Sequence, residues 1–108
     1  MTQNKKPAST PNPTPKKVLK KLLKFRDAID KADHALLKAF QKRNQVVEKV
    51  GKLKRQYKLP IVQPERWKEV LENRVKRGNR LNIHEPFLRE VLELIHQESI
   101  RIQKRGDK

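Results

Sequence analysis

The segment that decides the fold is residues 36–57, LLKAFQKRNQVVEKVGKLKRQY. One seam runs through it, which consists of Leu36, Phe40, Arg43, Val47, Val50, Lys54 and Tyr57. Steps that alternate between four and three residues place all seven side chains on one face of an α-helix. The seam therefore predicts a helix whose core-facing side carries two cations.

This helix extends well beyond the segment. From about Val18 to Tyr57 the sequence contains no proline and only one glycine, Gly51. Pro60 then ends the helix, because proline lacks an amide hydrogen and disfavours helical backbone in the residue before it. At 1.5 Å per residue, such a helix is about 55–60 Å long.

Two shorter helices follow. One begins after Gln63, with Pro64 in its first turn, and is expected to stop at Gly78-Asn79. The other opens around His84-Glu85-Pro86 and continues to about Gln103. Since no segment alternates apolar and polar residues for long enough to predict a strand, the fold class is all-α with three helices per chain.

The long helix also predicts the assembly. A compact chain of 108 residues has a radius of gyration of about 13 Å, and a rod of this length would overhang it. Two short helices cover only part of its apolar stripe, whereas a second copy of the chain would bury the rest. We therefore expect an intertwined homodimer.

Composition bounds the function. The chain carries 28 Lys and Arg against 12 Asp and Glu, a formal net charge of +16, and no cysteine. A disulfide, a thiolate metal site and a cysteine nucleophile are therefore excluded. No apolar run approaches the ~20 residues of a membrane helix, and no secretory signal is recognisable, so we expect a cytoplasmic protein.

Three regions are expected. Residues 1–17 contain four prolines and scattered lysines among Ser, Thr and Asn, a composition typical of a flexible tail. Residues 18–104 form the helical domain, and residues 105–108 form a basic C-terminal tail. The tails favour solubility, or a weak attraction to nucleic acid without sequence readout.

Five polar residues indicate a binding site. Arg43 and Lys54 occupy seam positions, where a buried charge must be paired or face a ligand. Ser99 occupies a core-facing step of the third helix, Gln103 follows one turn later, and Arg66 adds a planar fork suited to carboxylates. Each alone has an ordinary structural explanation, such as a snorkelling arginine. Five on matching faces, without acids on those faces, favour an anion site.

A series of motifs occurs in order along the chain: FRDAID at 25–30, LL at 36–37, Arg43, VGKLK at 50–54, PER at 64–66 and QESIRIQ at 97–103. Together they resemble the all-helical (type II) chorismate mutases over about residues 22–104. The phrase QPERW at 63–67 resembles the branch whose mutase module is fused to a synthase of the shikimate pathway.

The resemblance implies a homodimer of three-helix chains, with two active sites that each draw on both chains. It implies rearrangement of chorismate to prephenate, for phenylalanine and tyrosine synthesis, without a cofactor or metal. By position, Arg26 would enter the partner's site and, with Arg43, clamp substrate carboxylates. Lys54 and Gln103 would hydrogen-bond the ether oxygen of the breaking bond.

The resemblance also implies roles for Ser99 and Arg66, and the sequence departs from the family at two positions, Gln63 and Trp67. Ser99 would hold a carboxylate, and Arg66 would help to order the substrate. Gln63 stands where many members have an acid that meets the substrate hydroxyl, and its carbonyl still accepts a hydrogen bond. Trp67 stands where they have Glu, and we expect it to be a core anchor.

Such a reaction suits these residues on chemical grounds. A sigmatropic rearrangement transfers no proton and needs no acid, base or nucleophile. It needs a flexible dianion held in its reactive shape, and donors aimed at the oxygen where negative charge grows. Cations and amides on rigid helices supply both.

Three alternatives remain open. An isochorismate pyruvate lyase on the same scaffold would keep the cations. A basic helical module that binds nucleic acid agrees with the net charge, but its bases follow an interior seam and only Trp67 and Tyr57 can stack on nucleobases. A regulatory relic would have lost catalysis through the changes at Gln63 and Trp67. The chain acts alone or associates with a separate shikimate-pathway synthase, and no membrane partner is expected.

Overall fold

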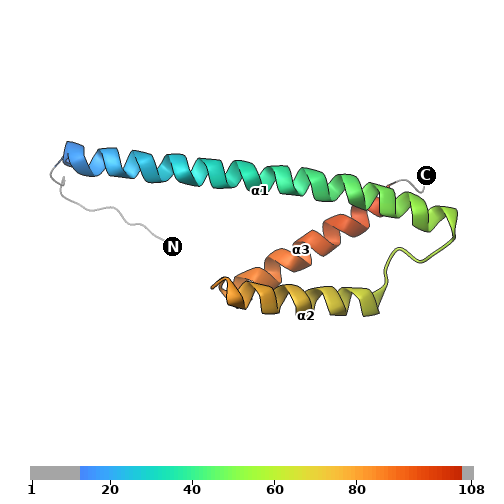
Figure 1. The fold of residues 1–108 in the computed structure, drawn as a ribbon. Coiled ribbons are helices and arrows are strands. Elements are labelled where there is room, and N and C mark those ends of the chain that lie inside the picture. Colours follow the sequence, from blue (N-terminus) through green and yellow to red (C-terminus); the bar gives the residue numbers. More distant parts are fainter. Residues whose placement is uncertain (1–12, 106–108) are drawn as a thin grey trace, which may run out of the picture. The chain divides into compact units, whose positions relative to one another are not determined.

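The computed structural model describes residues 13–105, which contain three helices and no strand. The helices are α1 (Lys16–Gln56), α2 (Pro64–Arg80) and α3 (Glu85–Lys104) (Figure 1). The predicted all-α fold with a long first helix is therefore confirmed. Residues 1–12 and 106–108, which belong to the expected tails, lie outside the described residues. Within residues 13–105, no helix is both long and apolar enough to cross a membrane.

The helix α1 begins and ends close to the predicted positions. It starts at Lys16, so Lys16 and Lys17, which were expected in the tail, are helical. It ends in a Schellman motif, in which Lys58 adopts a left-handed φ of 55° and the amide of Leu59 donates to the carbonyl of Lys54 at 2.8 Å. Pro60 follows, as expected for a residue that cannot continue a helix.

The second helix ends about two residues later than the sequence analysis predicted. Gly78 and Asn79 lie inside α2, which continues to Arg80. The left-handed residue is Asn82, with a φ of 59°, and the amide of Ile83 donates to the carbonyl of Gly78 at 2.9 Å. Asparagine tolerates this conformation better than most residues, so a second Schellman motif forms without a terminal glycine.

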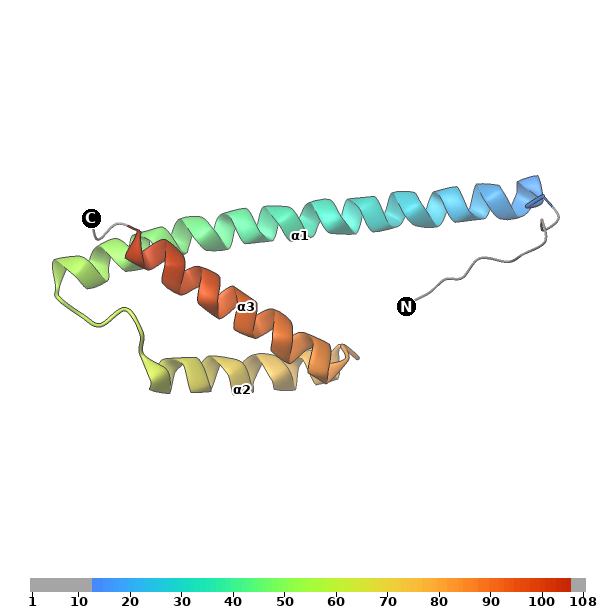
Figure 2. The same cartoon turned by 180° about the vertical axis from the view of Figure 1, so that it is seen from behind.

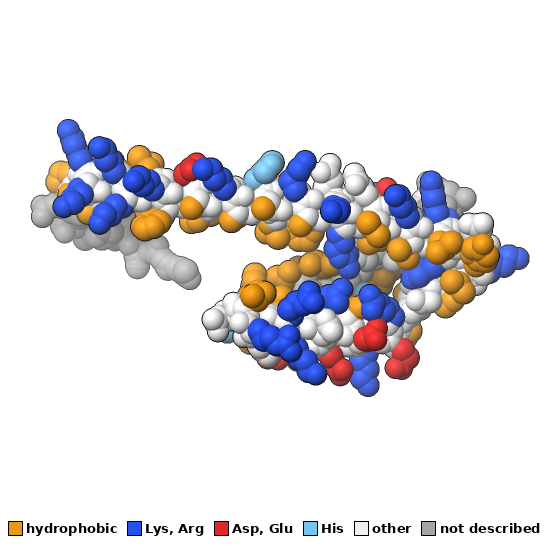
Figure 3. Space-filling view, viewed as in Figure 1, with side chains coloured by type: hydrophobic (Ala, Val, Ile, Leu, Met, Phe, Trp, Pro, Cys, Tyr) orange, Lys and Arg blue, Asp and Glu red, His pale blue; other side chains and the backbone are white. Residues whose placement is uncertain are grey.

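The chain divides into two compact units, residues 1–38 and residues 39–108, and α1 passes through both. In the second unit α2 packs against α3, and α3 returns to the last turns of α1 (Figure 2). Val75, Leu92 and Ile102 form its small buried hydrophobic core. In the first unit the apolar side chains of α1 are exposed in the single chain (Figure 3).

Gly51 marks a close approach of α1 to α3. It is buried, and a Cβ placed on it would lie 3.1 Å from the Cα of Gln103. Gly78 is also buried, but a Cβ there would meet the end of the Leu88 side chain. The first neighbour is backbone and the second is a side-chain tip, so only Gly78 has a neighbour that a rotamer change can move.

We predict that Gly51→Ala destabilises the protein by about 1–2 kcal/mol, because α3 must move away from α1. Gly78→Ala should cost less, since Leu88 can turn aside and alanine favours the helix by ~1 kcal/mol. Urea denaturation of both variants measures the difference. A larger loss for Gly78→Ala would contradict the close approach at Gly51.

Candidate active site

Six of the seven predicted site residues line one pocket in the second unit. The pocket has a volume of about 260 Å³ and is lined by all three helices and the loop between α1 and α2. The six residues are Arg43, Lys54, Gln63, Arg66, Ser99 and Gln103. The seventh, Arg26, lies on α1 in the unit of residues 1–38 and does not line this pocket.

Arg43 and Ser99 are joined directly across the pocket. The guanidinium Nη1 of Arg43 donates to Ser99 Oγ at 2.5 Å, and Ser99 Oγ donates to the carbonyl oxygen of Ile95 at 2.9 Å. Ser99 is buried, so this pair fixes one end of the guanidinium. Burial, and then the nearby charge of Arg74, lower the pKa of Arg43 from its ordinary value.

Lys54 is held from the loop between α1 and α2. Its Nζ donates to the carbonyl oxygen of Ile61 at 2.7 Å. An ammonium group has three donors, so two remain for a ligand. Burial lowers the pKa of Lys54, because partial desolvation disfavours the charged form.

Gln103 is buried at the end of α3, and one of the two polar atoms of its side-chain amide lacks a hydrogen-bond partner within residues 13–105. Its Nε2 donates to the carbonyl oxygen of Ser99 at 3.2 Å, whereas Oε1 has no hydrogen-bond partner among the described residues. The backbone carbonyl of Gln103 accepts from Arg55 Nη1 at 2.9 Å, which ties α3 to α1.

The pocket contains an aromatic wall that the sequence did not reveal. The rings of Trp67 and His96 stack with centroids 3.9 Å apart and planes 7° apart. Trp67 was expected to be a core anchor, and His96 had no assigned role, yet both line the pocket. The two residues come from different helices, and no sequence spacing indicates that they meet.

Arg74 is a further pocket residue that the sequence analysis missed. It follows Trp67 and Val70 in steps of three and four residues on α2. The pattern that identified Arg43, a cation on a stripe of apolar residues, would have found it. Four of the described lining residues are therefore Lys or Arg, and none is Asp or Glu.

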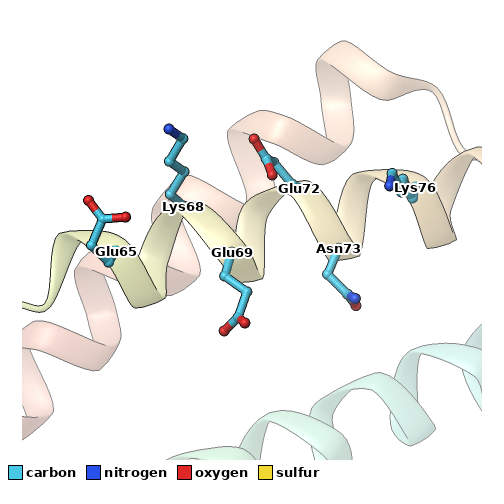
Figure 4. A pocket seen from close by; sticks show the side chains of 6 residues that line it. All are labelled: Glu65, Lys68, Glu69, Glu72, Asn73 and Lys76. Carbon is cyan, nitrogen blue, oxygen red and sulfur yellow. The ribbon is translucent and has the colours of Figure 1, made fainter.

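The opposite face of α2 is different in character. A shallow hollow there is lined by α2 alone, through Glu65, Lys68, Glu69, Glu72, Asn73 and Lys76 (Figure 4). Alternating charges along one helix face are typical of a solvated surface. Glu69 also reaches Arg66 at 2.8 Å, in a pair whose side chains are more than half exposed. This face contains none of the predicted site residues.

The pocket can hold and orient an anion. Arg43, Lys54 and Gln103 are held by hydrogen bonds to Ser99 or to the backbone, and apolar and aromatic side chains form much of the remaining wall. Ser99 donates its own proton to Ile95, so its hydroxyl is a hydrogen-bonding group rather than an activated nucleophile.

Comparison with known proteins identifies the family. The family model described as chorismate mutase type II matches residues 25–104, and the chain belongs to this family. The "T-protein" of Enterobacter agglomerans is 38% identical over 78 residues, which are 72% of this chain and 21% of that protein. The chain thus spans about a fifth of the length of that relative.

Two shorter relatives match along most of their length. The "4-amino-4-deoxychorismate mutase" of Streptomyces pristinaespiralis is 31% identical over 103 residues, which are 95% of this chain and 80% of that protein. The "Chorismate mutase" of Methanocaldococcus jannaschii is 28% identical over 87 residues, or 81% of this chain and 88% of that protein. No solved structure is significantly similar to the chain.

Proposed function

We propose that the chain is a chorismate mutase, which rearranges chorismate to prephenate. The observation that carries the proposal is the pocket whose lining, within residues 13–105, has four cations, one buried amide and no carboxylate. Chorismate is a dianion, so such a lining neutralises it. Membership of the chorismate mutase type II family supports the same reaction.

The proposed mechanism divides the pocket into two parts. Arg43, Arg66 and Ser99 hold the substrate's carboxylates and restrict a flexible molecule to its compact reactive shape. Lys54 and Gln103 face the ether oxygen, on which negative charge grows as the C–O bond breaks. Gln63 is proposed to meet the hydroxyl group.

The walls of the pocket support this chemistry. Val47, Val50 and Val70 line it together with the stacked rings of Trp67 and His96. Apolar walls lower the local dielectric around a bound substrate, so the charge of Lys54 acts more strongly on the developing oxyanion than it would in water. No proton transfer is required, which agrees with the hydrogen-bonded state of Ser99.

We also propose the homodimer and a shared active site. On α1, Leu22 and Ile29 are exposed in the single chain, and Arg26 lies on the same helix face, four and three residues away. A second α1 packed on this face would bury the apolar side chains and carry Arg26 into the partner's pocket. A cytoplasmic location, and association with a separate synthase, stay predictions.

The direct test is to add the protein to chorismate and follow the loss of its ultraviolet absorbance, with prephenate identified as the product. Lys54→Ala should lower kcat by about 10²–10³-fold, because the oxyanion loses its charged donor. The variant should remain a dimer by size-exclusion chromatography. Lys52→Ala is the matched control, since it removes the same charge from the same helix outside the pocket.

One result would contradict the role of Lys54, and another would overturn the assigned reaction. Near-normal turnover by Lys54→Ala would remove Lys54 from the reaction. Conversion of isochorismate to salicylate and pyruvate, without turnover of chorismate, would identify the protein as a lyase instead.

The pH profile should have an alkaline limb set by Lys54. Burial lowers its pKa below the ordinary lysine value of 10.5, and only the charged form stabilises the oxyanion. We therefore expect kcat/KM, which reports the free enzyme, to fall as the pH rises through this lowered pKa. In Lys54→Arg the limb should move to higher pH, because a guanidinium remains charged. An unchanged limb in this variant would assign it to another group.

Mixed dimers test the shared site. Arg26→Ala and Lys54→Ala should each be nearly inactive alone. If Arg26 acts in the partner's pocket, unfolding the two variants together and refolding them should restore about a quarter of wild-type activity, because half of the dimers carry one intact site. No restoration would place Arg26 outside the partner's site.

A further inference from the structure

Among the described lining residues, Arg74 is the one cation that the proposed mechanism does not use. It lies on α2, and it lines the pocket together with Trp67 and Val70 of the same helix. Its side chain makes one weak contact, from Nη1 to the amide oxygen of its neighbour Asn73 at 3.5 Å. Among the described residues, no carboxylate lies within ion-pair distance of Arg74.

Other arginines of the second unit are balanced differently. Arg66, Arg89, Arg101 and Arg105 each pair with a glutamate. Three of these arginines lie outside the pocket, and only Arg66 lines it. Arg43 and Arg74, which face the same pocket, have no such partner among residues 13–105.

Arg43 and Arg74 line the same pocket, one from α1 and one from α2. The positive charge of Arg74 contributes to the lowered pKa of Arg43. Two like charges across a pocket are unfavourable when it is empty, and an anion between them removes the repulsion. Each guanidinium carries five N–H donors, and Arg43 uses one of them on Ser99, so both retain donors for a carboxylate.

We propose that Arg74 is a substrate-binding residue, which shares with Arg43 one carboxylate of the substrate. The inference rests on the proposed function for the identity of the substrate. It adds a second guanidinium on α2 to the carboxylate site that Arg43 and Ser99 form between α1 and α3. The pocket then favours a ligand with two carboxylates, because none of its described lining residues is an acid that could accept an ammonium group.

The test compares Arg74→Leu with Arg77→Leu. Both variants remove one arginine from α2 and change the net charge equally, but Arg77 does not line the pocket. Arg74→Leu should raise the KM for chorismate about tenfold or more, as expected for the loss of a charge-assisted hydrogen bond. Its kcat should change little, because the contact is made in the ground state and the transition state alike. Arg77→Leu should leave both parameters within about twofold.

Two readouts separate binding from a structural effect. Trp67 is the only tryptophan of the chain and lines the pocket, so its fluorescence reports the binding of prephenate without turnover. Prephenate affinity should fall about tenfold in Arg74→Leu, and the rise of KM with added salt should become less steep. Arg74→Lys should recover part of the affinity, since it restores the charge without the planar fork.

The outcomes distinguish the two proposals. If the wild type converts chorismate and Arg74→Leu matches Arg77→Leu in KM and prephenate affinity, the role of Arg74 is wrong and the proposed function stands. If the wild type binds prephenate without converting chorismate, and only Arg74→Leu weakens that binding, the role of Arg74 stands and the catalytic proposal fails. A wild type that does neither overturns both.

Discussion

The close approach of α1 and α3 at Gly51 is the constraint on which the pocket depends. A Cβ at Gly51 would lie 3.1 Å from the Cα of Gln103, so the two backbones meet only because this residue has no side chain. On either side of the contact, Arg43 reaches Ser99 and Arg55 reaches the carbonyl of Gln103. The crossing therefore places the end of α3, with its two buried polar residues, against the cationic seam of α1.

Uncompensated positive charge is the second property that defines the site. In the described part of the chain, the pocket is lined by four cations and no acid, and of its three arginines only Arg66 pairs with a glutamate. Partial burial of Arg43 and Lys54 makes their charged forms less favourable, as the lowered pKa of each shows. A bound anion offsets the repulsion between the cations and favours the charged forms of Arg43 and Lys54. The unfavourable electrostatic energy of the empty pocket is therefore relieved when the anion binds, which contributes to its affinity and orientation.

The helices could be predicted because their signals are local. The spacing of apolar residues and the positions of Pro60 and Pro64 are read from short stretches of sequence. These signals predicted the start or end of each helix to within about two residues. The stop of α2 was misplaced because its left-handed residue is Asn82 rather than a glycine. The same periodicity singled out Arg43 and Lys54, and the ordered family motifs added Gln63 and Arg26 to the candidate residues. Arg74 carried a similar signal that was overlooked.

The sequence by itself determined three helices, the cationic seam of the long helix, and the residue types that a dianion requires. Periodicity fixes which side of a helix a residue occupies, and this is enough to recognise a charge on an apolar stripe. Only the tertiary structure decided what faces that stripe. Three features depend on how separate helices cross. Within residues 13–105, they are the stacking of Trp67 on His96, the unsatisfied oxygen of Gln103, and the positions of Arg43 and Arg74 in the lining of one pocket. That crossing is set by packing between residues far apart in the chain, which no spacing along a single helix encodes.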